Sequence, residues 1–431
     1  MRGKKLLGIF TALLLVLVLA ACTSKDSGTT PKDNSDGGKK DDGKFSGELT
    51  VWVHPFVGSE LADQQSEVFE KMAADFKVEN PDAKVKFEVI PWANREQKIL
   101  TALAANQGPD IFYLIPDMMA QFADKGVLTP ITDLLGDDWD KEDFPESSLA
   151  AVTYKDDLFG LPILHEVRAN VYNTDVLKEI GASEEDVPTT WEEFDALAKK
   201  AVDKGYYARG FEGGNTLNAT LYPVLWQAGG DVIDENGKVI INNEKGLKTF
   251  ERINDWYKDE YIPKDSINAL THFEDFLEGT HLSSGATGLT LSTLKERKFD
   301  QYVLGPPLKG EEQATFGTTG MFVVPSNSKN KEAAAELIKY MTNTDNSMAF
   351  NELTKYIPPR KSAAGIYDDD PEMLKMTEWL EYTKPGVIHP VSRDIIPLVT
   401  AEIQAMLEGT KTPKQAADDS AAVIQGEIDK Q

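Results

Sequence analysis

The only cysteine of the 431-residue chain, Cys22, occupies a position in which its thiol can be modified. It follows Leu19-Ala20-Ala21, and such small residues let a signal peptidase reach the backbone before the thiol takes up a thioether-linked lipid. Upstream, a basic stretch precedes an apolar run, Leu6 to Ala20. This layout is typical of a signal peptide, and the run is shorter than the roughly 20 residues that cross a bilayer. We therefore predict a lipoprotein signal peptide at residues 1–22, with a transmembrane anchor as the weaker alternative. The mature protein is expected on the extracytoplasmic face of the cell membrane, held by lipid on Cys22.

Other residue types give little sign of catalysis or of metal binding. A single cysteine excludes a disulfide and a thiolate metal site within the chain. The five histidines, at positions 54, 165, 272, 281 and 389, include no pair spaced by three or four. The chain has no Gly-x-Ser-x-Gly, His-Glu-x-x-His or Walker motif. Carboxylate pairs are frequent because the chain is acidic, so none stands out as a glycosidase acid and nucleophile. We expect no enzyme, no cofactor and no metal site; a surface glycoside hydrolase and a metal-ion receptor are the weaker hypotheses.

Composition separates a polar N-terminal tract from a large acidic module. Residues 23–44 contain Thr, Ser, Lys, Asp, Gly and Asn but almost no large apolar side chain, which predicts a disordered tether. Residues 45–431 are too many for one hydrophobic core, so two domains are expected. The whole chain has a net charge of −26. Such a surface repels phosphate backbones, and nucleic acid is not expected as a partner.

The first part of the module predicts alternating strands and helices. The expected elements are a strand at 48–53, a helix from residue 59, a strand at 84–90, a helix at 96–106 and a strand at 111–115. This order predicts an open sheet with right-handed crossovers, in which ligands lie beyond the carboxyl ends of the strands. Further helices are expected at 190–202, 244–257 and 331–341, the last after a strand at 321–324.

Short motifs along nearly the whole module resemble one family. They are Leu49-Thr50-Val51-Trp52, Gly108-Pro109-Asp110-Ile111-Phe112, Phe159-Gly160-Leu161-Pro162, Val171-Tyr172-Asn173-Thr174-Asp175, Pro188 to Phe194, Ala228-Gly229-Gly230, Ser328 to Ala334 and Gly409 to Pro413. In this order, and behind a lipoprotein signal, they resemble the extracellular solute-binding proteins of sugar ABC importers, the group that includes maltose-binding protein.

The resemblance implies an α/β fold of two hinge-linked lobes, each a mostly parallel sheet flanked by helices, with a central cleft for the solute. By analogy the chain passes between lobes near 163–168, 303–309 and 342–356. Lobe 1 would then comprise 45–163 and about 303–345, and lobe 2 about 168–302 and 350–431. The implied partners of this monomer are a carbohydrate, expected to be an oligosaccharide, and the membrane permease of an ABC importer. A phosphate ester such as glycerol phosphate is the alternative ligand.

A pyranose presents an apolar C–H face and a rim of hydroxyls, so its site needs flat aromatic rings and planar polar side chains. Candidates come from strand ends, from the expected crossings and from positions where the family binds sugar. They are Trp52, His54, Asp117, His165, Glu166, Arg168, Tyr222, Trp226, Thr318, Thr319, Tyr356 and Arg360.

Most of these candidates also have an ordinary structural interpretation. Trp52 and His54 can be buried, and Glu166 can form a local pair with Arg168. Arg360 can pair with an acidic neighbour on this surface. One of Tyr222 and Trp226 is expected to stack on the sugar while the other packs; Tyr222 stands where maltose-binding protein has a tryptophan. The segment 317–320, Gly-Thr-Thr-Gly, is expected to be a turn that lets the ligand approach the backbone, or simply a turn.

Overall fold

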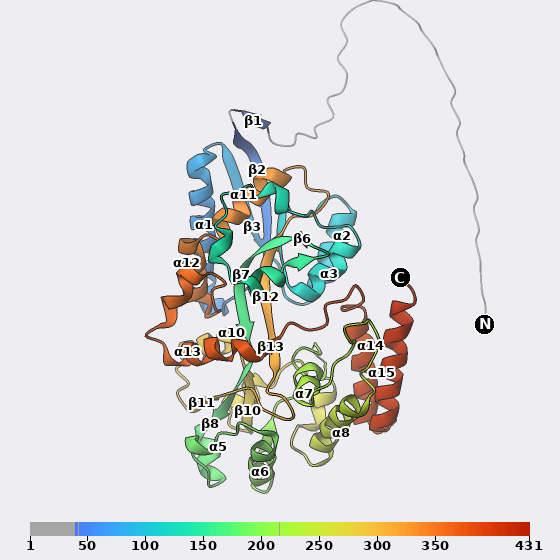
Figure 1. Cartoon of the computed structure of the whole chain (residues 1–431). Coiled ribbons are helices and arrows are strands. Elements are labelled where there is room, and N and C mark those ends of the chain that lie inside the picture. Colours follow the sequence, from blue (N-terminus) through green and yellow to red (C-terminus); the bar gives the residue numbers. More distant parts are fainter. Residues whose placement is uncertain (1–38, 42, 215) are drawn as a thin grey trace, which may run out of the picture. The chain divides into compact units, whose positions relative to one another are not determined.

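The computed structural model describes residues 39–41, 43–214 and 216–431 (Figure 1). The predicted signal peptide, Cys22 and the tether up to residue 38 lie outside these residues. Within the described ranges, no helix is both long and apolar enough to span a membrane.

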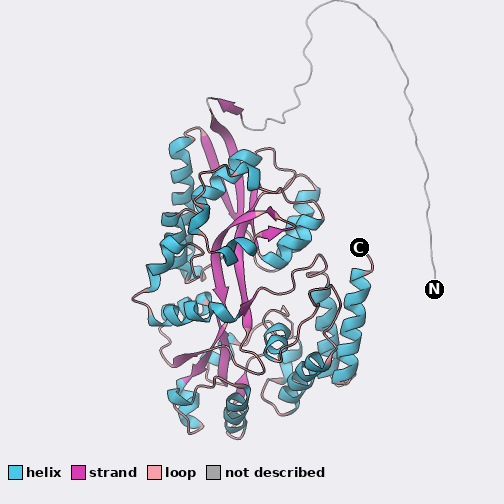
Figure 2. Ribbon diagram, viewed as in Figure 1, coloured by secondary structure: helices cyan, strands magenta, loops and turns pink. Residues whose placement is uncertain are grey.

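The strands and helices follow one another in the alternating order expected for an α/β protein. The strands are β1 (Lys39–Asp41), β2 (Lys44–Val53), β3 (Ala83–Val89), β4 (Ile111–Leu114), β5 (Thr153–Tyr154), β6 (Asp157–Leu158), β7 (Gly160–Val167), β8 (Ala169–Asn173), β9 (Tyr207–Arg209), β10 (His281–Ala286), β11 (Tyr302–Gly305), β12 (Thr315–Val323) and β13 (Thr383–Lys384). The helices are α1 (Ala62–Glu79), α2 (Arg95–Ala104), α3 (Pro116–Asp124), α4 (Glu146–Ala150), α5 (Thr174–Glu179), α6 (Trp191–Val202), α7 (Leu221–Gln227), α8 (Glu244–Lys258), α9 (Phe273–Leu277), α10 (Gly288–Glu296), α11 (Lys331–Met341), α12 (Thr344–Thr354), α13 (Pro371–Glu378), α14 (Ile395–Leu407) and α15 (Pro413–Ile428). Figure 2 shows the strands running through the described chain with helices around them.

The predicted β-α-β-α-β start is confirmed as β2, α1, β3, α2 and β4. Both β3 and β4 pair with β2 in parallel. Helix α1 buries Phe69, Met72 and Phe76 on one face and ends at Asn80, whose side chain accepts a hydrogen bond from the Phe45 backbone N–H at 2.7 Å. The predicted cap of α6 is also confirmed, because Thr190 and Glu193 form a reciprocal capping box.

Strand β1 corrects the predicted extent of the tether. Residues 39–41 were expected to be disordered, but they pair antiparallel with residues 44–46 at the start of β2. The prediction relied on the lack of apolar side chains in this tract. A hairpin is held by backbone hydrogen bonds to a neighbouring strand, and those need no such side chains.

The two larger sheets are mixed and β5 pairs antiparallel with β6, which corrects the expectation of mostly parallel sheets. In the first sheet β12 runs antiparallel to both β4 and β7. In the second, with strand order β11-β8-β10-β9, only the β9–β10 pairing is parallel. In the second sheet β8 runs antiparallel to both β10 and β11.

Buried side chains divide the chain into two lobes with separate hydrophobic cores. The core of the first lobe draws on residues 45–164 and 321–356. The cores of the second lobe draw on residues 167–316 and 357–424. The chain therefore changes lobe within β7, within β12 and at residues 356–357.

The second passage between the lobes differs from the expected one. It was placed near 303–309, but residues 302–305 form β11 of the second sheet. The passage lies instead in β12 at residues 317–320, the segment expected to be a turn before a strand at 321–324. Backbone pairing with β7 makes these residues part of the strand. The glycines of segment 317–320 allow neighbouring chain to pack closely. A Cβ on Gly317 would lie 2.6 Å from the Glu166 carbonyl oxygen and 2.3 Å from the Thr383 side chain.

This close approach predicts that Gly317→Ala destabilises the protein. The added methyl group must displace backbone of β7, and such overpacking lowers the free energy of unfolding by about 1–3 kcal/mol. Urea denaturation measures the change. Gly426→Ala in α15 is the matched control, because a Cβ there meets nothing within 4 Å. A Gly317→Ala protein as stable as the wild type would contradict the close packing of the two strands.

Candidate ligand-binding cleft

Polar and aromatic side chains from both lobes lie close enough to interact electrostatically. We call this group the central cluster; it consists of Arg95, Tyr113, Asp117, Glu166, Tyr222, Tyr356 and Arg393. Asp117, Glu166, Tyr222 and Tyr356 were predicted site residues, whereas Arg95, Tyr113 and Arg393 were not.

The proximity of these groups is evident from their mutual electrostatic effects. Burial raises the pKa of the Tyr113 hydroxyl, the Arg95 charge opposes that rise, and the Glu166 and Asp117 charges add to it. Burial likewise raises the pKa of Tyr222, with a further contribution from Asp117. Burial lowers the pKa of the Arg95 guanidinium. The cluster is thus a desolvated set of charges and hydroxyls contributed by both lobes.

Asp117 lies in the first turn of α3, directly after β4, and connects the lobes. Its Oδ1 accepts the Met118 backbone N–H at 2.7 Å, which orients the carboxylate. Its Oδ2 accepts from Arg393 Nη1 at 3.1 Å, and its backbone carbonyl accepts from Ser392 Oγ at 2.8 Å. Arg393 Nε also donates to Glu96 Oε2 at 3.3 Å. The segment before α14 is therefore bound to α2 and α3 of the first lobe.

A neighbouring contact extends this connection. Gln121 Nε2 donates to Asp394 Oδ2 at 3.1 Å. We call the whole set the inter-lobe contact; it consists of Glu96, Asp117 and Gln121 in the first lobe and Ser392, Arg393 and Asp394 in the second. It holds the lobes together on the side where α2 faces α14.

Trp92 offers an exposed aromatic ring at this point. It is 36% exposed and stacks on the buried His54 ring, with centroids 4.1 Å apart. Its Nε1–H donates to the Pro55 carbonyl at 3.0 Å, and the Arg95 guanidinium lies 5.1 Å from the ring centroid. Trp92 was missed, although it follows the strand at 84–90 and the rule of strand ends indicated its position. His54 serves as the support of this ring.

A cavity of about 660 Å³ adjoins Trp92 and is lined from both lobes. Trp92, Arg95 and Glu96 line it from the first lobe, while Arg393, Ile396 and Pro397 line it from the second. A smaller cavity of about 240 Å³ lies in the second lobe beside Arg168, Glu212 and Pro223. Arg168, which lines this cavity, pairs with Glu166 of the central cluster.

His165 lies on β7 and is held from both sides. Its Nδ1 is 3.0 Å from Thr319 Oγ1 on β12, and its Nε2 is 2.8 Å from Ser148 Oγ. Burial lowers the pKa of His165 to about 4. The ring is therefore neutral at physiological pH and pairs with hydroxyls.

Glu166 and Arg168 form the local pair that was the structural alternative for both. Arg168 Nε donates to Glu166 Oε1 at 3.1 Å, and the guanidinium lies 5.4 Å from the Phe316 ring. Thr318 pairs with Glu166 across the two strands. Its buried hydroxyl has no hydrogen-bond partner in the described chain.

Three further candidates, Trp52, Trp226 and Arg360, also lie outside the central cluster. Trp52 is buried in the first core and donates Nε1–H to Glu88 Oε2 at 2.9 Å. Trp226 is buried in the second lobe, on α7, with its ring centroid 5.6 Å from that of Tyr222. Arg360 is buried against Asp143, with Nη1 to Oδ2 at 2.9 Å, and bonds the Thr342 carbonyl. These contacts match the structural interpretations of the three residues.

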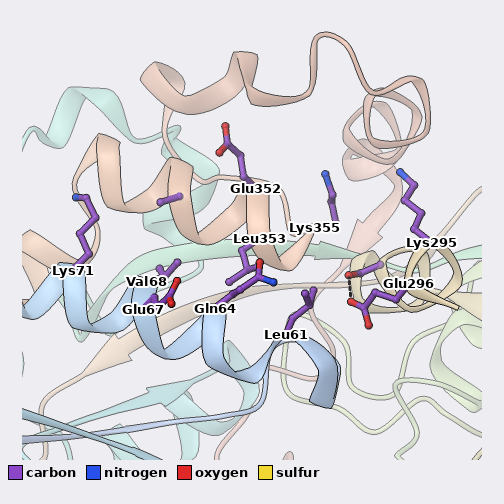
Figure 3. Close-up of a pocket in the computed structure, with 12 residues that line it drawn as sticks. Leu61, Gln64, Glu67, Val68, Lys71, Lys295, Glu296, Glu352, Leu353 and Lys355 are labelled. Atoms are coloured by element: carbon purple, nitrogen blue, oxygen red, sulfur yellow. Dashed lines mark hydrogen bonds between the residues drawn. The ribbon is translucent and has the colours of Figure 1, made fainter.

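A further cavity, of about 650 Å³, is lined by α1, α10 and α12 (Figure 3). Val68 and Leu353 contribute apolar surface, with Lys71, Lys295 and Glu352 around them. None of its lining residues is aromatic or a predicted site residue. It is therefore less suited to a stacked ring than the cavity at Trp92.

Comparison with known proteins identifies the family. The family model described as "Bacterial extracellular solute-binding protein" matches residues 62–348. The chain belongs to this family of binding proteins.

Relatives of this solute-binding protein include two from Bacillus subtilis (strain 168). The galactooligosaccharide-binding protein is 26% identical, with 99% of this chain and 98% of the relative covered. The arabinooligosaccharide-binding protein is 25% identical, with 98% and 99% covered. Among solved structures, the GacH receptor of Streptomyces glaucescens, studied unliganded and in complex with acarbose, has a TM-score of 0.76 at 21% identity. That match covers 88% of this chain and 98% of the other, and it supports the two-lobed fold.

The buried His165 predicts a pH dependence for the stability of this solute-binding protein. The folded pKa of about 4 lies below the ordinary value of 6.5, so the unfolded chain binds more protons between these pH values. Stability therefore falls as pH falls from 6.5 towards 4. His165→Gln should reduce the slope of the unfolding free energy against pH by about 1 kcal/mol per pH unit.

Urea unfolding at pH 6.5, 6.0, 5.5 and 5.0 measures this slope. His389→Gln is the control, because burial lowers the pKa of His389 but the Asp124 charge opposes that lowering, so it should contribute less. An unchanged slope in His165→Gln would show that the imidazole is solvated in the folded protein.

Proposed function

We propose that the protein is the extracytoplasmic receptor of an ABC importer, binding an oligosaccharide in the cleft between its lobes. The observation that carries the proposal is the exposed Trp92 ring beside Arg95 and Arg393 at a cavity lined from both lobes. A flat ring suits the apolar face of a pyranose, and guanidinium groups donate in the plane of its hydroxyls. The volume of about 660 Å³ falls within the range of small-ligand sites.

Unsatisfied polar atoms near the cluster support a ligand with hydroxyl groups. The buried Tyr222 and Thr318 hydroxyls have no hydrogen-bond partner in the described chain. Buried polar groups are normally paired, so each is a candidate for a partner on the ligand. Sugar hydroxyls both donate and accept, and therefore suit such hydroxyls and the neighbouring Asp117 and Glu166 carboxylates.

Transport requires that solute binding change the position of one lobe relative to the other. A ligand shifts an open and closed equilibrium only by its difference in affinity for the two states. A solute that contacts Trp92 in one lobe and Arg393 in the other gains both contacts only when the lobes are closed. The closed form would then be the one that the permease recognises and unloads.

The names of the relatives agree with this ligand class. The two Bacillus subtilis proteins are named for galacto- and arabino-oligosaccharides, and they align over almost the full length of this chain. A phosphate ester is the second candidate, because Arg95 forms no ion pair within the described residues. A guanidinium without a carboxylate partner is suited to a phosphate.

We further propose that lipid on Cys22 attaches this monomeric receptor to the cell membrane and that residues 23–38 serve as its tether. A tethered receptor stays at high local concentration near its permease, whereas a free one diffuses away.

The ligand proposal predicts that calorimetric titration detects saturable binding of at least one oligosaccharide among galacto-oligosaccharide, arabino-oligosaccharide and maltotriose. The sugar should be recovered unchanged. Trp92→Ala should weaken binding about tenfold or more, since the stacked ring is lost. Trp92→Phe should retain most of the affinity.

Trp139→Ala is the matched control, because Trp139 is a partly exposed tryptophan that lies against Phe144, away from the cluster. Binding of glycerol 3-phosphate without any sugar would favour the phosphate-ester candidate. Accumulating hydrolysis product would contradict a receptor, and equal loss of affinity in both alanine variants would refute the proposed position of the site.

The anchor proposal predicts that the chain expressed in a bacterium incorporates labelled fatty acid and fractionates with membranes. Cys22→Ser should abolish the label and release the protein. The chain has no other cysteine that could accept the lipid. Equal labelling of both proteins would overturn the proposal.

A further inference from the structure

Two buried histidines in the second lobe lie face to face, away from the inter-lobe contact. His272 is 2% exposed and His281 is 3% exposed. Their ring centroids are 5.2 Å apart and their planes are 30° from parallel. Asp275 lies beside them, with Oδ2 3.1 Å from His272 Nδ1.

Local structure brings together three residues that are up to nine positions apart. His272 precedes α9 as its cap residue, and Asp275 lies in the first turn of that helix. Gly279 has a φ of +74°, a conformation that glycine readily adopts and that reverses the chain between α9 and β10. His281 is the first residue of β10 and pairs with Tyr207 of β9. The helix, turn and strand thus form a rigid frame around the two rings.

The hydrogen bonds fix where each imidazole carries its proton. The Asp275 carboxylate only accepts, so His272 Nδ1 carries the hydrogen. Thr280 Oγ1 donates to the Asp275 backbone carbonyl at 2.9 Å. It must therefore accept from His281 Nδ1, also at 2.9 Å. A ring that carries only this Nδ1 proton keeps its lone pair on Nε2.

Neither of these nitrogen lone pairs is satisfied. His272 Nε2 and His281 Nε2 are both buried without a hydrogen-bond partner in the described chain. A buried pair of bare imidazole nitrogens needs an electron-pair acceptor.

We propose that His272, Asp275 and His281 form a binding site for a divalent transition-metal ion such as Zn²⁺. One ligand atom from each of the three residues lies within 4.8 Å of the other two. Ligand atoms on a tetrahedral zinc ion, at bond lengths of about 2.0–2.1 Å, are closer together than this. The Asp275 side chain is 47% exposed, so its carboxylate can turn towards the ion. Water would complete the coordination.

The chemistry of the donors selects the class of metal. Imidazole with a carboxylate suits Zn²⁺, Ni²⁺ and Cu²⁺ better than Ca²⁺ or Mg²⁺, which take oxygen ligands. The hydrogen bond between His281 Nδ1 and the Thr280 hydroxyl orients the His281 ring, as hydrogen bonds to the second ring nitrogen commonly do for metal-binding histidines. The sequence had predicted no metal site, so this inference departs from that expectation.

Titration calorimetry of the full-length chain with Zn²⁺, and absorption spectroscopy with Co²⁺, test the site. All proteins carry Cys22→Ser, which removes the only thiol ligand. We expect one ion per chain, together with a visible Co²⁺ absorption band of a low-coordinate site. His272→Gln and His281→Gln should each weaken binding about a hundredfold or more, and Asp275→Asn by about tenfold or more. His389→Gln should bind as the wild type does.

Circular dichroism establishes whether each variant is folded. If the buried histidine variants do not fold, Asp275→Asn decides the outcome, because its half-exposed side chain can be replaced without disturbing the core. Absence of Zn²⁺ binding at millimolar ion, or binding unchanged by Asp275→Asn and by whichever histidine variants fold, would overturn the proposal. Neither result depends on the identity of the transported solute.

Discussion

The pairing of β7 with β12 is the interaction on which the rest of the structure depends. Val167 to Gly160 lie opposite Gly317 to Val323, so one antiparallel pair extends from the second lobe into the first. Both lobes are attached to this pair, and any change in their relation must bend it. Glycines at 317 and 320 let other chain segments approach closely. His165, Glu166, Thr318 and Thr319 lie on the same two strands, so bending the hinge also moves cleft residues.

The inter-lobe contact opposes opening of this hinge. Asp117 and Arg393 form an ion pair in which both side chains are mostly buried, and removing either partner from such a pair is costly. The pair nevertheless gains little net free energy, because both groups lose hydration on closure. An arrangement of this kind specifies the geometry of closure without making the closed state very stable. Solute binding can then decide between the two states.

Much of the fold followed from the sequence, because its signals are local. The alternation in residues 84–90 and the capping box at Thr190 report directly on the backbone. The full extent of β12 could not be predicted, because Gly-Thr-Thr-Gly is typical of a turn. Only pairing with β7, a strand distant in the sequence, makes these four residues part of β12. For the proposed site, the rule of strand ends predicted Asp117, and Trp92 was not among the predicted residues although it also follows a strand. Arg393 carried no local signal, because its partner Asp117 is 276 residues away along the chain.

His272 and His281 also show how little residue spacing alone can predict about a site. Metal ligands on one helix are spaced by three or four residues. His272 and His281 do not have this spacing, so the criterion does not connect them. The α9-to-β10 turn brings them together because Gly279 reverses the chain, and Asp275 lies on the intervening helix. Burial leaves both Nε2 atoms without a hydrogen-bond partner in the described chain, which sequence spacing cannot show. Spacing rules describe regular elements, whereas a site made by a turn depends on how that turn is packed.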